Sequence, residues 1–217
     1  GSEMCIRDSK IGDNLDITVS FDEAVTVTGT PTITLSNNDV ASYTSGSGST
    51  TIVFRTTIAS GDTDSADLSV SSIQSTAGGA TMKDSAGNTI DTTVTGGDLG
   101  SVVVDANAPA FTSVAATDGA YGVGETLSIT VTWGEAVSVS GTPTLTLSNN
   151  DVASYVSGSG STALVFTTQI AEGDTASADL SVTSYSGTIA DTAGNAAGAA
   201  SGDLGSVTVD GAVPVFA

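Results

Sequence analysis

The side chains of this chain that could do chemistry are mainly carboxylates, amides and hydroxyls. There are 24 Asp and Glu residues against four Lys and Arg, no His and a single cysteine. General acid–base and nucleophilic catalysis rely most often on His, Cys or Lys. Two carboxylates across a cleft could hydrolyse a glycosidic bond, and the pairs to consider are Asp22 with Glu23 and Asp191 with Glu135. Because Asp22 is replaced by Gly134 in a second copy of the same sequence, we expect no enzymatic activity.

Five oxygen-bearing residues are better suited to holding a metal ion. We expect Glu135 in the loop after the second strand of the second repeat, and Asp191 and Asn195 in a loop before its last strand. Asp105 and Asn107 lie where the chain enters that repeat. In a seven-strand sandwich these segments return to one pole, and carboxylate and amide oxygens are the ligands that calcium takes in six to eight coordination. The sequence therefore predicts a calcium site that stiffens the junction between two repeats.

A weaker version of this site is expected in the first repeat. The corresponding residues are Glu23, Asp84 and Asn88, but the entering segment has no counterpart there. The alternative interpretation is that the Asp and Asn residues only stabilise turns by hydrogen bonding to their own backbone. Both interpretations remain open at this point.

A second acidic cluster, residues 62–67 (DTDSAD), has the spacing of a calcium loop without the glycine and distal glutamate of an EF-hand. The second copy keeps Asp174 and Asp179 but has Ala176 in place of the middle carboxylate. A dedicated metal site would not survive that replacement. We interpret these carboxylates as turn and strand-start residues.

The segments that must position these residues are duplicated. Residues 21–70 (FDEAVTVTGTPTITLSNNDV…ADLSV) reappear as residues 133–182 (WGEAVSVSGTPTLTLSNNDV…ADLSV) at a constant offset. Repeats of roughly 105–112 residues are too long for a solenoid unit and match one self-sufficient domain. We predict two domains in series, each with its own core.

The composition indicates β-structure. The chain is 39% hydrophobic but only 5% aromatic, with 26 Gly, and no stretch has a helical pattern. Residues 15–21 (LDITVSF) and 127–133 (LSITVTW) alternate apolar with polar residues, as half-buried strands do. Further strands are expected at residues 32–35, 40–43, 51–58, 66–73, 101–105 and 110–116. About seven strands per repeat predict an all-β fold of two tandem immunoglobulin-like Greek-key sandwiches.

Three motifs occur twice in the same order: the run EAVxVxGTP, the loop SGSGS, and D(S/T)AGN. Together they resemble the bacterial Ig-like repeats of very large surface adhesins and of the cyanobacterial swimming-associated SwmB-type proteins. The resemblance covers about residues 11–210. It implies an Ig-like fold and a spacer or adhesion role in an extracellular or cell-surface protein, with no chemistry attached.

The segments outside the repeats set the expected domain boundaries. Residues 1–10 (GSEMCIRDSK) contain Cys5 and share nothing with the repeat, so we interpret them as a non-native leader. Repeat one then covers residues 11–105, with its first strand missing or replaced, and repeat two covers residues 106–210. Residues 211–217 match the entry to repeat two and are interpreted as the start of a third repeat.

The net charge of −20 restricts the partners of the chain. Such an acidic balance repels nucleic acid and anionic membranes, and no apolar stretch is long enough to span a bilayer. With Cys5 in the leader, no disulfide can form within either repeat. The expected partners are neighbouring repeats of the same chain, with a surface glycan or self-association as further options.

Two alternatives to a spacer remain. The first is a carbohydrate- or ligand-binding adhesive module, for which only Tyr121 and Tyr185 are candidate surface aromatics, because Phe21 and Trp133 occupy inward strand positions. The second is a filament subunit. In that case a C-terminal strand at residues 213–216 would fill the groove left by the missing first strand of another molecule.

Overall fold

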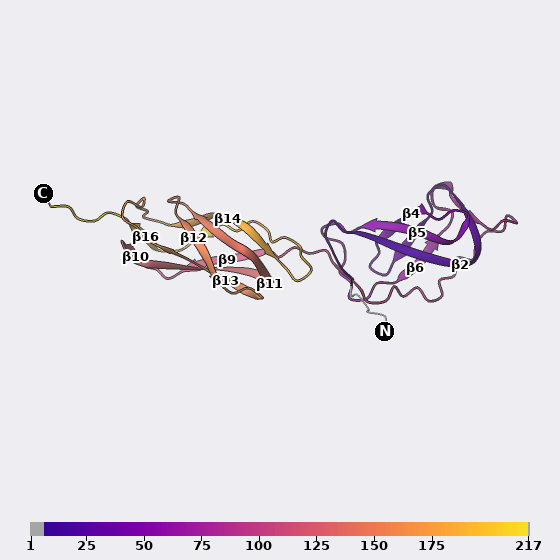
Figure 1. Ribbon diagram of the computed structural model, residues 1–217, viewed down its shortest axis with the longest axis horizontal. Helices are drawn as coiled ribbons and strands as arrows, with labels where there is room; N and C mark the ends of the chain where they lie inside the picture. Colours follow the sequence, from indigo (N-terminus) through magenta and orange to yellow (C-terminus); the bar gives the residue numbers. More distant parts are fainter. Residues whose placement is uncertain (1–6, 217) are drawn as a thin grey trace. The chain divides into compact units, whose positions relative to one another are not determined.

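The computed structural model describes residues 7–216, which divide into two compact units between Asn107 and Ala108. Both units are built from β-strands in several sheets, consistent with β-sandwiches (Figure 1). Among the described residues the only helical turn is the 3-10 segment Ala77–Gly79. The prediction of an all-β protein is confirmed.

The first unit has one main sheet and one small parallel pair. The main sheet has the order β6-β3-β4-β5-β2-β7, and β1 pairs with β8 in parallel. The strands are β1 (Arg7–Lys10), β2 (Asn14–Thr28), β3 (Thr32–Leu35), β4 (Val40–Ser45), β5 (Ser49–Thr57), β6 (Val70–Gln74), β7 (Thr81–Lys83) and β8 (Val102–Asp105).

The second unit also has eight described strands and a similar plan, but one of them, β9, has no counterpart among the described strands of the first unit. Its main sheet has the order β12-β13-β11-β14-β15, β9 pairs with β11 as well, and β10 pairs with β16 in parallel. The strands are β9 (Phe111–Ala116), β10 (Gly119–Gly122), β11 (Thr126–Leu147), β12 (Val152–Ser157), β13 (Ser161–Gln169), β14 (Ser181–Ala190), β15 (Gly202–Asp203) and β16 (Val207–Asp210).

The duplication extends to the strand register. Asn14 pairs with Thr57 between β2 and β5, and Thr126 pairs with Gln169, the same positions of the second copy, between β11 and β13. Each unit buries its own apolar cluster along the inward-facing positions of these strands. Burial of a separate core in each unit supplies each with its own hydrophobic stabilisation.

Four leader residues belong to the fold of the first unit. Arg7–Lys10 pairs with β8 as β10 pairs with β16 in the second unit, although the two sequences share no residues. Parallel pairing uses backbone groups, which every non-proline residue carries, so an unrelated sequence can occupy this position. The remaining leader residues, 1–6, lie outside the described part of the chain.

Gly141 lies inside β11, where a positive φ of 76° and a shift in the pairing with β14 interrupt the regular ladder without ending the strand. Residues 213–216 have no strand partner among the described residues and are exposed. They align with residues 108–111, which precede or only begin β9.

Candidate metal centre

The loop after β14 is organised by Asp191 and Asn195. The backbone N–H groups of Gly194 and Asn195 donate to Asp191 Oδ1 at 2.7 and 2.8 Å, and the Asn195 side-chain amide donates to Asp191 Oδ2 at 3.0 Å. Both residues are buried. In the second unit, Asp191 and Asn195 therefore do stabilise their own turn, as one of the two interpretations of the sequence predicted. A carboxylate has about four acceptor sites, so these bonds leave room for a metal ion.

Glu135 reaches the same loop from β11. It was expected in a loop after the second strand, but the strand continues through it from Thr126 to Leu147. The pairing with β13 shifts register between Thr132 and Val137, so the segment around Glu135 bulges without ending the strand. Such an irregularity redirects a side chain while the ladder continues on either side.

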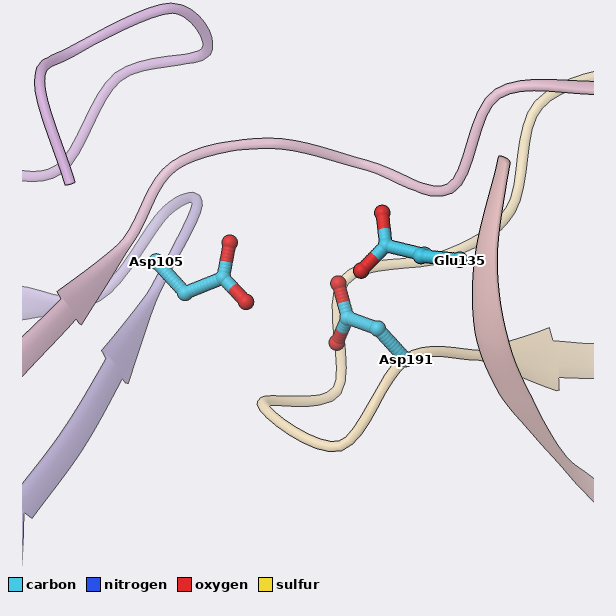
Figure 2. Close-up of side chains that lie close together, drawn as sticks. All are labelled: Asp105, Glu135 and Asp191. Atoms are coloured by element: carbon cyan, nitrogen blue, oxygen red, sulfur yellow. The ribbon is translucent and has the colours of Figure 1, made fainter. Parts of the chain in front are cut away.

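The structure brings Glu135 and Asp191 together. Figure 2 shows their two carboxyl groups close to each other, and each offers an oxygen within 4.8 Å of the other. Two oxygens bound to one calcium at 2.3–2.6 Å can be at most about 5 Å apart. The pair is therefore compatible with a shared calcium ion, as is the hard, all-oxygen character of the donors.

Asp105 and Asn107 belong to the first unit. Asp105, also drawn in Figure 2, is the last residue of β8. Its Oδ1 accepts the backbone N–H of Asn107 at 3.1 Å. The Asn107 side-chain amide donates to Asp64 Oδ2 at 2.7 Å, and the Ala106 N–H donates to Asp64 Oδ1 at 2.8 Å. Asp64 thus holds the segment after β8 against the first unit.

This role of Asp64 was missed by the sequence analysis, which grouped it with turn carboxylates. A comparison of the two copies could have revealed this role. Asp64 is replaced by Ala176 in the second copy, and Asn107 is replaced there by Ala212. A residue and its hydrogen-bond partner therefore change together between the repeats. Asp62 and Asp174 do stabilise turns, since each accepts a backbone N–H three residues earlier, from Ala59 and Ala171.

In the first unit, Glu23, Asp84 and Asn88 line one cavity of about 360 Å³. Asp84 Oδ2 accepts the Asn88 side-chain amide at 2.7 Å, and Oδ1 accepts the backbone N–H groups of Ala86 and Asn88 at 2.8 Å. These hydrogen bonds lower the pKa of Asp84 below its ordinary value of 3.8, and the bond from the Asn88 side chain has the largest effect. Asn88 is exposed, whereas its counterpart Asn195 is buried.

The aromatic residues considered for sugar binding pack inside the second unit. Trp133 is 2% exposed, which confirms its prediction as a core residue. Tyr185 packs edge-to-face on Trp133 with ring centroids 5.9 Å apart, and its hydroxyl donates to the carbonyl of Ala197. Tyr121 is half-buried and donates to the carbonyl of Thr117. Stacking on a sugar needs an exposed ring face, so these residues give the ligand-binding alternative no support.

Comparison of the chain with family models, with curated proteins and with solved structures finds no match in any of the three. Within the described part of the chain, no helix has the length and apolar character needed to cross a bilayer.

Proposed function

We propose that the chain consists of two immunoglobulin-like repeats that act as spacer, or extender, domains of a long secreted or surface-attached bacterial adhesin. The supporting observation is the duplication of a complete unit, with its own core and the same strand register. Selection for length favours such copying, whereas a catalytic or recognition site does not require a second scaffold. The proposed role is mechanical and includes no enzymatic activity.

We further propose that calcium binds through Glu135 and Asp191. The proximity of their carboxyl groups supports this assignment. Asn195, which is bonded to Asp191, and the chain segment carrying Asp105 and Asn107 are the proposed additional ligands, because that segment ends immediately before the second unit. A bound ion would then limit the motion of one repeat against the next. Glu23, Asp84 and Asn88 would form a weaker site.

The test is a calcium titration followed through Trp133, the only tryptophan, which lies in the core of the second unit. The parent chain is compared with the double variant Glu135→Gln, Asp191→Asn, in which the amide oxygens keep the acceptor role. Glu172→Gln, at an exposed glutamate, is the matched control. Calcium is expected to raise the unfolding midpoint of the parent and the control by several degrees, and that of the double variant by much less.

A third variant separates metal binding from stiffening. Asp105→Ala is expected to retain part of the calcium response of the second unit but to lose the calcium-dependent change in small-angle scattering. If calcium changes neither the midpoint nor the scattering of the parent, the metal proposal is wrong and the spacer proposal stands without it. If the two units share one unfolding transition, the proposal of self-sufficient repeats is wrong.

A further inference from the structure

The last residues of the first unit are held by the loop between β5 and β6. Gly61 donates its N–H to the carbonyl of Ala106 at 3.1 Å, and the N–H of Ala106 donates to Asp64 Oδ1 at 2.8 Å. The Asn107 side-chain amide donates to Asp64 Oδ2 at 2.7 Å. Ala106 is fully buried. The chain is therefore bound to the first unit as far as Asn107.

The first residues of the second unit are bound to it almost immediately afterwards. The carbonyl of Pro109 accepts the N–H of Gly198 at 3.1 Å, and the carbonyl of Ala110 accepts the N–H of Gly134 at 2.8 Å. β9 then begins at Phe111. The second unit thus holds the chain from Pro109 onwards.

Only Ala108 lies between these two bound segments. A single residue spans at most about 3.6 Å, so the connection has almost no slack. The proline ring disfavours helical backbone angles at the residue before it, and it fixes the φ of Pro109 itself. The backbone rotations that remain are mainly ψ of Asn107 and a restricted φ and ψ of Ala108.

We propose that Ala108 is the hinge between the two units, and that Asp64 and Pro109 keep this hinge stiff without a bound ion. Asp64 is a positioning residue, because the hydrogen bonds that it accepts fix the end of the first unit. Relative motion is the default for domains joined in one chain. The inference therefore adds to the proposed spacer role a stiffness that does not depend on the calcium proposal.

The second unit indicates that a repeat folds without this aspartate. Asp64 is replaced there by Ala176, while the bond from the loop glycine is kept between the N–H of Gly173 and the carbonyl of Gly211 at 2.9 Å. Asp64 thus supplements an attachment that both units share. Removal of its carboxylate should leave the first unit folded.

The test measures backbone amide relaxation by NMR on the whole chain in excess chelator, because this relaxation reports how fast each unit tumbles. In the parent, amides of both units should give one common correlation time, that of the whole chain. A variant with several Gly and Ser residues inserted after Ala108 is the reference for units that tumble independently. Its correlation times should be clearly shorter.

Asp64→Ala should shift the correlation times toward this reference, because Asn107 then joins the hinge. Amide hydrogen exchange should become at least about tenfold faster at Ala106, which loses a hydrogen bond to a charged group. It should stay unchanged at Val104, whose N–H is bonded to a backbone carbonyl. Asp67→Ala, which removes an exposed carboxylate from the same loop, is the matched control and should follow the parent in both measurements.

Pro109→Ala tests the other side of the hinge. It releases the backbone restriction but keeps the carbonyl that Gly198 bonds, so it should shorten the correlation times without changing exchange at Ala106. The proposal is wrong if the parent in chelator tumbles like the insertion variant, or if either Asp64→Ala or Pro109→Ala tumbles like Asp67→Ala. A common correlation time that appears only after calcium is added would support the calcium proposal and overturn this one.

Discussion

Asp84 and Asp191 occupy the same position in the two repeats and bond to their own loops in nearly the same way. For Asp84 the hydrogen bonds from Asn88 lower the pKa in the folded state below 3.8. A carboxyl group with a lowered folded-state pKa stabilises the fold above its unfolded-state pKa, and this contribution is lost as the pH falls through the folded-state value. Asp84 therefore links the stability of the first unit to acidity.

We expect Asp84→Asn to flatten this pH dependence. Asn keeps an acceptor oxygen for the turn but carries no charge. The unfolding midpoint of the first unit should fall for the variant at neutral pH, and the gap from the parent should narrow as the pH drops below 3.8. Thermal unfolding by circular dichroism across this range measures the effect. Asp67→Asn, at an exposed aspartate, is the control and should follow the parent.

At the residue level the sequence was sufficient to nominate Glu135 and Asp191, because acidic residues kept in both copies stood out in a chain without His. It could not place Glu135 correctly. The bulge in β11 depends on how Trp133 pairs with β9 while Val137 pairs with β13, and both are contacts between distant parts of the chain. The partnership of Asp64 with Asn107 is non-local for the same reason.

At the level of elements, the hairpins β4–β5 and β12–β13 depend on one glycine each. Gly158 has a φ of 108°, and a Cβ there would lie 2.0 Å from the carbonyl oxygen of Ala163. Gly46 has the same environment beside Thr51. An L side chain would therefore meet both an unfavourable backbone conformation and a clash with backbone, which cannot move as a side chain can.

We predict that Gly158→Ala destabilises the second unit by about 3 kcal/mol or more, whereas Gly160→Ala costs about 1 kcal/mol. Gly160 also has a positive φ, of 86°, but nothing lies within 4 Å of a Cβ there. Chemical denaturation followed by Trp133 fluorescence gives both values. If both variants lose the same free energy of unfolding, the positive φ alone determines the loss and the clash at Gly158 contributes nothing.

Most strands were predictable because the apolar alternation has a period of two and most turns carry glycine. Residues 32–35 and 111–116 follow the expected bounds almost completely. The strand expected at residues 66–73 starts only at Val70, since the preceding segment makes isolated bridges to β8 and the loop before it. The pairing of Arg7–Lys10 with β8 had no sequence signal, because it uses backbone groups alone.

At the level of the whole molecule, two separate cores predict two unfolding transitions. Ile33 and Leu145 are aligned, and both are fully buried. Replacing either with Ala should cost about 2–5 kcal/mol and lower the midpoint of its own unit by roughly 10 °C or more. Ile33→Ala should leave the transition seen by Trp133 unchanged, and Leu145→Ala should shift it. Equal shifts from both variants would indicate that the units unfold together.

The parallel pairs β1–β8 and β10–β16 determine how each unit would carry tension. In each pair one strand lies near the start of the unit and the other at its end. When a chain is pulled from both sides, two parallel strands are drawn lengthwise past each other, so their hydrogen bonds share the load and do not open one at a time. If the unit is pulled from its two ends, as the proposed spacer role implies, a ladder of four residue pairs would resist the force in shear.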